Sequence, residues 1–153
     1  MTQNIKILIV DDDPVGLIAT SRIVKKAGYE VLIALNAVEC IDSARVNHPD
    51  LILMDVLLPD IEGADLCRHI KKDSELKGTY VVLTSPQRTD PAEQAIGFDA
   101  GADGYIASAV SNYELTAGVN SMVRILKAER ERDQLIIELK DGKNGVQIFS
   151  LEN

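Results

Sequence analysis

The chain has 153 residues, 46% of them apolar, and a formal net charge of −8 at pH 7. This length allows one domain with a proper core and a short appendage. The acidic balance argues against direct nucleic-acid binding, which requires clustered positive charge. No apolar run approaches the roughly 18 residues of a membrane span, and the first residues lack the basic, apolar pattern of a signal peptide. We therefore expect a soluble cytoplasmic protein.

Short β-branched runs alternate with helical patterns, which is typical of βαβ units around a parallel sheet. Pro14 suits a first helical turn, and Gly28 suits a helix C-cap. Strands are expected at 5–10, 30–34, 51–54, 80–83 and 104–106, and helices at 14–27, 37–47, 63–73, 91–100 and from 111 onward. The predicted fold class is α/β, a doubly wound five-stranded parallel sheet (flavodoxin-like, order 2-1-3-4-5) with helices on both faces.

The last predicted helix changes character after Leu126. Before it, an apolar stripe at helical spacing is expected to face the core, formed by Leu115, Val119, Met122, Val123 and Leu126. After it, a heptad repeat counted from Leu115 places the charged residues Glu129 and Arg132 at a and d positions, which are normally apolar in a coiled coil, so this repeat is a weak candidate for helix pairing. Residues 135–139 either continue the helix or pair with 146–149 as a hairpin. We expect one domain over 1–126 and a charged helical extension and tail over 127–153 without an output domain, either as a stand-alone protein or as part of a longer one.

Polar residues follow three of the predicted strands. Asp11 and Asp12 follow the first, Asp55 the third and Thr84 the fourth. The carboxyl ends of parallel strands meet at one crevice, so three carboxylates and a hydroxyl are expected to share a pocket. Close carboxylates repel one another, and a hard divalent cation keeps them ionised. Magnesium suits such a site because it binds one or two carboxylates, keeps waters and leaves a position for a phosphate oxygen.

The joint spacing of four motifs is informative. They are Val10-Asp11-Asp12-Asp13-Pro14, then Leu53-Met54-Asp55 with Pro59 and Gly63, then Val82-Leu83-Thr84-Ser85, then Gly101-Ala102-Asp103-Gly104-Tyr105. Together they resemble the receiver domain of bacterial two-component response regulators, over about residues 4–126. The resemblance implies a signalling domain rather than an enzyme.

The resemblance also implies a role for individual residues. Asp55 would accept a phosphoryl group from a sensor histidine kinase or a phosphotransfer protein. Thr84 and Ser85 would contact the phosphate, and Thr84 and Tyr105 would form the conformational switch. Mg²⁺ would be held by Asp11, Asp12, Asp55 and the backbone carbonyl of Leu57.

The signal is expected to leave through the fourth helix, fifth strand and fifth helix. The partner would be a downstream protein or a second copy of the chain, with no direct role for nucleic acid or a membrane. On this face we expect Leu115, Met122 and Ile125 to be exposed enough to contribute.

One departure from the family pattern opens an alternative. Ser108 stands where receivers carry a lysine, and Ala109 where they carry a proline. Because that lysine makes a charge-assisted bond to the phosphate, its absence supports the alternative of a pseudo-receiver, a phosphorylation-independent protein-interaction module, although every group needed for metal binding and phosphoryl acceptance is present. Arg88 is a candidate replacement cation.

A second alternative is an enzyme. The run 11–15 also resembles the first motif of haloacid-dehalogenase-type phosphohydrolases, with Thr84 as their second motif. That family needs a lysine further on, and residues 85–126 contain none.

Overall fold

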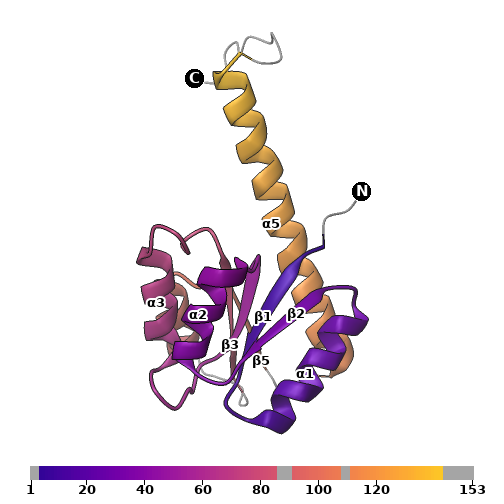
Figure 1. The fold of residues 1–153 in the computed structure, drawn as a ribbon, viewed down its shortest axis with the longest axis vertical. Coiled ribbons are helices and arrows are strands. Elements are labelled where there is room, and N and C mark those ends of the chain that lie inside the picture. Colours follow the sequence, from indigo (N-terminus) through magenta and orange to yellow (C-terminus); the bar gives the residue numbers. More distant parts are fainter. Residues whose placement is uncertain (1–3, 86–90, 108–110, 143–153) are drawn as a thin grey trace.

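The computed structural model describes residues 4–85, 91–107 and 111–142. Five parallel strands form one sheet in the order β2-β1-β3-β4-β5, which confirms the predicted fold class (Figure 1). The strands are β1 (Lys6–Val10), β2 (Glu30–Ala34), β3 (Leu51–Asp55), β4 (Tyr80–Ser85) and β5 (Gly104–Ala107). The helices are α1 (Pro14–Lys26), α2 (Ala37–Asn47), α3 (Gly63–Lys72), α4 (Pro91–Asp99) and α5 (Asn112–Lys140).

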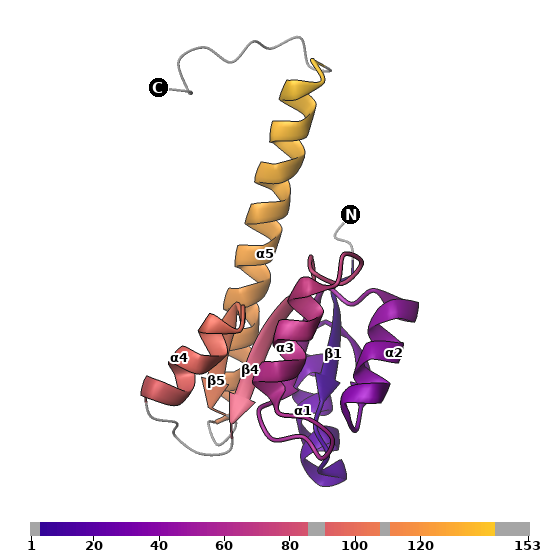
Figure 2. The ribbon, with the colours of Figure 1, turned by 90° about the vertical axis from the view of Figure 1, so that its left-hand side faces the viewer.

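The sheet lies between two layers of helices. Helices α2, α3 and α4 cover one face, and α1 and α5 cover the other (Figures 1 and 2). The central strand β1 serves both layers, since Leu8 and Val10 belong to the apolar cluster on the first face, and Ile7 and Ile9 to the cluster on the second. Such double burial is typical of parallel sheets and explains why β1 is apolar on both faces from Ile7 to Val10.

The helix boundaries follow local capping. The Asp13 carboxylate accepts a hydrogen bond from the Val15 amide, and Pro14 occupies the first helical position of α1. At the other end Ala27 is the cap residue, and Gly28 follows it with φ 103°. This left-handed backbone favours glycine. Gly28 was expected to be the C-cap, and in the structure it lies one residue after it.

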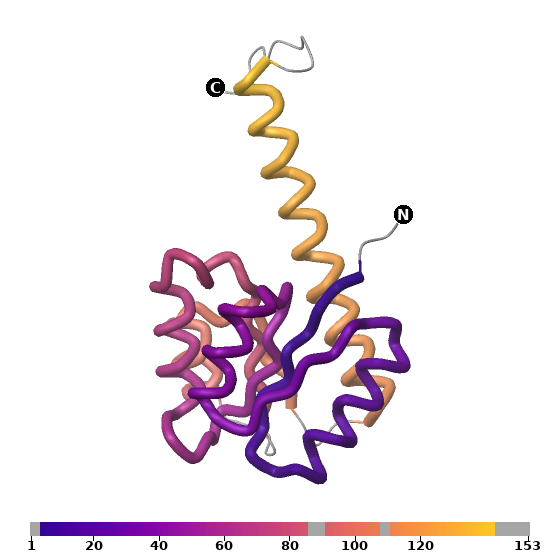
Figure 3. The backbone as a smooth tube through the Cα atoms, viewed as in Figure 1, coloured from indigo at the N-terminus to yellow at the C-terminus, as the bar shows by residue number. Residues whose placement is uncertain are grey.

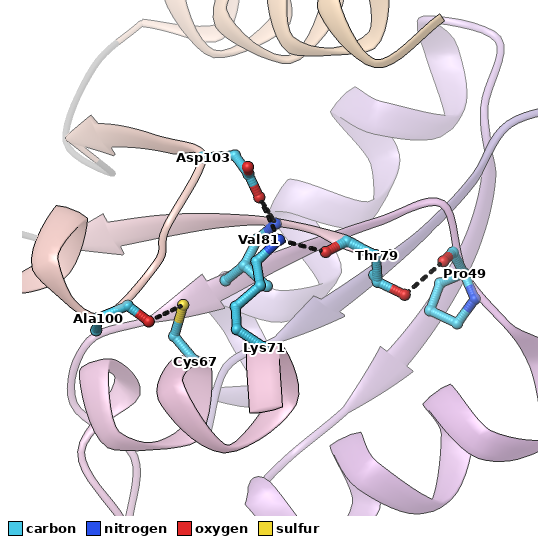
Figure 4. Close-up of polar contacts among 7 residues, drawn as sticks. All are labelled: Pro49, Cys67, Lys71, Thr79, Val81, Ala100 and Asp103. Atoms are coloured by element: carbon cyan, nitrogen blue, oxygen red, sulfur yellow. Dashed lines mark hydrogen bonds and ion pairs between the residues drawn. The ribbon is translucent and has the colours of Figure 1, made fainter. Parts of the chain in front are cut away.

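A polar network ties α3 to the edge of the sheet at which the strands begin (Figure 4). Lys71 Nζ lies 2.8 Å from both Asp103 Oδ2 and the carbonyl oxygen of Thr79, and the amide of Val81 donates to the same Asp103 oxygen at 2.9 Å. Asp103 therefore holds α3, the start of β4 and the segment before β5 together. It has a structural role at the edge opposite the predicted site.

Helix α5 is much longer than the other helices and projects beyond the sheet (Figures 1 and 3). An ion pair between Arg130 and Asp50, 2.7 Å long, ties it to the body of the domain. The helix continues to Lys140, so the hairpin alternative is wrong for residues 135–139, while its partner strand at 146–149 lies outside the described residues. None of the described helices combines the length and the apolar character that a membrane span requires.

The exposure of α5 corrects one expectation. Leu115 is only 8% exposed and packs in the apolar core, so it is not available on the surface as expected. Met122 is partly buried against the same cluster, whereas Ile125 is 44% exposed. The core-facing stripe and the exposed face thus share one helix, with only Ile125 of these three clearly on the outside.

Candidate functional site

Three carboxylates meet where β1 and β3 end. The two strands are neighbours, with Val10 opposite Met54, so Asp11 and Asp55 leave the sheet side by side. One carboxylate oxygen from each of Asp11, Asp12 and Asp55 lies within 4.8 Å of the others. We call these three residues the acidic cluster. The structure therefore brings together the carboxylates that the sequence placed at one crevice.

Backbone amides fix the orientation of the carboxylates. Asp11 Oδ1 accepts a hydrogen bond of 3.0 Å from the amide of Asp13, and Asp55 Oδ1 accepts one of 2.9 Å from the amide of Leu57. Gly16 lies beside them, since a Cβ built at this position would be 3.2 Å from Asp11 Oδ2. The small residue leaves space next to the acidic cluster.

The electrostatics of the acidic cluster oppose full ionisation. Burial, more than anything else, raises the pKa of Asp55, and the nearby charges of Asp11 and Asp12 raise it further, while the Leu57 amide lowers it. Burial is also the main cause of a raised pKa at Asp11, with Asp12 and Asp13 adding to it and the Asp13 amide acting against it. A bound cation would offset both effects.

The donor set fits a hard divalent cation. All three ligands are carboxylate oxygens, the type that Mg²⁺ and Ca²⁺ prefer. Asp12 is exposed while Asp11 and Asp55 are half-buried, so the acidic cluster is open to solvent on one side, as an ion that keeps waters requires. The structure places Leu57 two residues after Asp55 with its amide bonded to that carboxylate. A ligand role for its carbonyl stays a prediction.

Gly63 brings the start of α3 against the end of β3. Its amide donates to the carbonyl of Val56 at 2.8 Å, and a Cβ at this position would lie 2.6 Å from the carbonyl oxygen of Asp55. Real Cβ atoms do not approach backbone this closely, so only glycine fits without a shift. The spacing from Asp55 to Gly63 thus has a steric cause in the backbone at the site.

Asp60 anchors the loop that follows Asp55, and the sequence analysis did not identify it. Its carboxylate accepts hydrogen bonds from the amides of Ala37, at 3.0 Å, and Val38, at 3.3 Å, at the start of α2. Asn36 caps the same helix through the Glu39 amide. The partners of Asp60 lie 22 and 23 residues away, so no local pattern pointed to this contact.

Thr84 and Ser85 end the neighbouring strand. Thr84 lies opposite Asp55 in the β3–β4 register, and its carbonyl accepts a hydrogen bond of 2.9 Å from the amide of Val56. Thr84 is half-buried, and Ser85 is 4% exposed. Both residues therefore lie at the same sheet edge as the acidic cluster, while their contact with a phosphate stays a prediction.

Tyr105 packs between β4 and α4. It lies opposite Leu83 in the β4–β5 register, and its ring centroid is 6.5 Å from that of Phe98. A Cβ at Gly97 would lie 3.4 Å from the Tyr105 ring, so this glycine allows the close approach. A groove of about 330 Å³ lies beside the ring, and its lining includes Leu57, Ser85 and Tyr105. The proposed switch residue thus lines a groove that reaches the end of β3.

Three residues that the sequence analysis discussed lie outside the described residues. They are Arg88, Ser108 and Ala109. The departure from the family lysine at Ser108 is therefore a property of the sequence, and its effect stays a prediction.

Comparison with known proteins identifies the family. Residues 7–120 match the model of the response regulator receiver domain. The chain belongs to this family, whose members are signalling domains of two-component systems. This match leaves the resemblance to haloacid-dehalogenase-type phosphohydrolases without support.

Relatives agree with this assignment. The chain is 30% identical over 138 residues to the response regulator MprA of Mycobacterium tuberculosis, covering 90% of this chain and 59% of that protein. It is 30% identical over 124 residues to the transcriptional regulatory protein CseB of Streptomyces avermitilis, covering 81% of this chain and 51% of that protein. The chain thus spans little more than half the length of these relatives.

A solved structure shows the same fold. The CheY-like receiver domain protein of Methanospirillum hungatei superposes with a TM-score of 0.75 at 30% identity, covering 83% of this chain and 99% of that chain.

Proposed function

We propose that Asp55 accepts a phosphoryl group from a phosphohistidine on a partner histidine kinase or phosphotransfer protein. One Asp55 carboxylate oxygen attacks phosphorus in line, the P–N bond to the imidazole breaks, and its electron pair returns to the ring nitrogen. The product is an acyl phosphate on Asp55. The observation that supports this role is the position of Asp55 within the acidic cluster, at the end of a central strand and with its carboxylate oriented by the Leu57 amide.

Asp11, Asp12 and Asp55 would hold a Mg²⁺ ion. A bound Mg²⁺ neutralises charge on the phosphoryl oxygens, which is the main requirement of phosphoryl transfer. We expect Asp12→Ala to weaken Mg²⁺ binding about tenfold or more, because one hard oxygen ligand is lost. A Mg²⁺ titration followed by thermal unfolding measures this, with the exposed Asp42→Ala on α2 as control. Equal Mg²⁺ affinity in the parent and in Asp12→Ala would reject the ligand assignment.

Thr84 and Ser85 would bind the phosphoryl oxygens, and Tyr105 would follow the movement of Thr84. The surface that changes would be the face of α4, β5 and α5, where Ile96 is 57% and Phe98 49% exposed. This face would dock a downstream protein or a second copy. We place this phosphoryl transfer and the docking that follows it in the cytoplasm.

The test is chemical phosphorylation of the full chain. Acetyl phosphate and Mg²⁺ should produce an acid-labile mass gain of one phosphoryl group, detected by intact mass spectrometry. Asp55→Asn preserves the side-chain volume but removes the nucleophile, so this variant should gain no label. An equal label on Asp55→Asn would refute the assignment.

The pseudo-receiver remains the second candidate because Ser108 replaces the family lysine. A parent chain that stays unlabelled in EDTA and in Mg²⁺ alike, while Ser108→Lys takes up label, would favour it. Label on the parent chain would favour the phosphoacceptor.

A further inference from the structure

The surface of α5 beyond the domain body combines exposed apolar residues with an ordered pattern of charge. Leu135, Ile136 and Ile137 are 51%, 40% and 51% exposed. At 3.6 residues per turn, Leu135 and Ile137 lie on nearly opposite sides of the helix, with Ile136 between them. Isolated apolar residues on a surface are common, so the side of the helix on which each residue lies decides whether it can belong to an interface.

The helix has two distinct sides. Leu126 is fully buried and Arg130 pairs with Asp50, so these positions face the domain body. At 3.6 residues per turn, Ile125, Ala128 and Arg132 fall on roughly the opposite side, and Leu135 and Leu139 continue that line. We call these five positions the outer seam.

The outer seam follows a heptad repeat. Ile125, Arg132 and Leu139 occupy a positions, and Ala128 and Leu135 occupy d positions. Arg132 is the single charged member, whereas the frame counted from Leu115 has two. Its long apolar stem can cover the seam while the guanidinium remains in water. A single polar residue at an a position is a known means of fixing register and strand number.

The flanking charges are self-complementary. In this frame Arg124 is at a g position and Glu129 at the following e position, and in a parallel pair each g side chain meets the e side chain five residues further on the partner helix. Arg124 of one copy would thus face Glu129 of the other, twice by symmetry. The frame counted from Leu115 pairs Ala128 with Asp133 and Leu135 with Lys140 at its g and e positions within 125–140, so neither pair joins opposite charges.

We propose that two copies of this chain associate through the outer seam as a short parallel coiled coil. The inference goes beyond the proposed function, because it requires neither phosphate nor Mg²⁺. From Ile125 to Leu139 the seam is only about 21 Å long at 1.5 Å per residue, so the dimer dissociates on dilution.

Sedimentation of the full chain over a concentration series tests the seam. Leu135→Lys should raise the dimer Kd about tenfold or more, since a buried leucine is lost from each copy. Ile137→Lys is a matched control, because Ile137 is equally exposed and lies on the other side of the same helix. A chain that stays monomeric throughout, or an equal effect of the two variants, would overturn the proposal.

A charge exchange tests the parallel frame. Arg124→Glu and Glu129→Arg should each raise the Kd, because each places like charges opposite one another. The double variant should recover most of the parent affinity. Failure of the double variant to recover would reject this frame.

A cysteine tests the orientation. In a parallel pair the two copies of residue 135 adjoin, so Leu135→Cys should form a disulfide-linked dimer under mild oxidation. The native Cys40 and Cys67 are buried, and burial raises the pKa of their thiols to about 12 and about 11. They should therefore not form disulfides in this experiment. Absence of the cross-link would contradict parallel pairing. Asp55→Asn should dimerise like the parent, which separates this test from that of phosphorylation.

Discussion

The Asp55 carboxylate is the residue on which burial and charge act together. Burial and then the neighbouring carboxylates raise its pKa in the folded state above the ordinary value of 3.8. A carboxyl group whose pKa is raised in the folded state stabilises the fold at pH values below its unfolded-state pKa. This stabilisation is lost as the pH rises through its folded-state pKa. At neutral pH and without metal, ionised Asp55 therefore destabilises the fold.

The first prediction concerns Asp55→Asn in EDTA. The variant should unfold at a higher temperature than the parent at pH 7, because a repelled and partly buried charge has been removed. The gap should narrow as the pH falls from the raised folded-state pKa toward 3.8, where the parent carboxyl is protonated as well. Thermal unfolding across this pH range measures the gap, and a gap independent of pH would contradict the electrostatic account.

The second prediction concerns Gly63. A Cβ here meets backbone atoms of Asp55 and Val56 at 2.6 and 2.8 Å, so Gly63→Ala should destabilise the fold by about 1–3 kcal/mol through overpacking. Gly78→Ala is the control, because a Cβ there has no neighbour within 4 Å. Urea unfolding compares the two variants. Equal stability of both would mean that α3 tolerates a side chain at its start.

The acidic cluster could be predicted from the sequence because each of its residues follows or ends a strand that is recognisable along the chain. Asp11 and Asp55 follow apolar strands, and parallel pairing of those strands was enough to bring their carboxylates together. The anchoring role of Asp60 could not be predicted, because it depends on residues that are distant in the sequence. Its partners belong to α2, and only the three-dimensional path of the loop after β3 brings them near.

At the scale of elements, α2 depends on a contact from another segment. The Asp60 carboxylate binds two amides at its start, where helix N–H groups lack partners within the helix. We predict that Asp60→Ala lowers the free energy of unfolding by about 0.5–2 kcal/mol, the range for loss of a helix cap. Glu62→Ala in the same loop is the control, since the Glu62 side chain makes no capping bond to α3. Chemical denaturation measures the free energy of unfolding of both variants. An Asp60→Ala variant as stable as the parent would contradict the anchoring role of Asp60.

Strand and helix boundaries could be predicted to within about two residues, because caps and apolar periodicity mark them along the chain. The end of α5 could not, since Leu135–Leu139 suits either a helix or a strand and no neighbouring element arbitrates. The exposure of Leu115 was likewise misjudged: the packing of α5 against the sheet turns this residue inward.

At the scale of the whole molecule, α5 joins a packed half to a projecting half. Within 115–126 the helix contributes four buried residues to the core, whereas Leu135 to Ile137 are exposed. We predict at least tenfold faster amide exchange in 131–140 than in 115–126 when the chain is dilute, because an isolated helix end is marginally stable. Hydrogen exchange with mass spectrometry measures this. Protection of 131–140 should rise with protein concentration, and equal protection of both halves in dilute solution would contradict the prediction.

The continuity of α5 also gives the molecule a lever arm. Residues 126 to 140 form about 21 Å of straight helix at 1.5 Å per residue. A tilt of about 10° where α5 leaves the body would carry Lys140 sideways by about 4 Å over that length. A small rearrangement beside β5 would therefore become a displacement of atomic size far from the sheet, and two such arms in parallel would change the angle between the two domains they join.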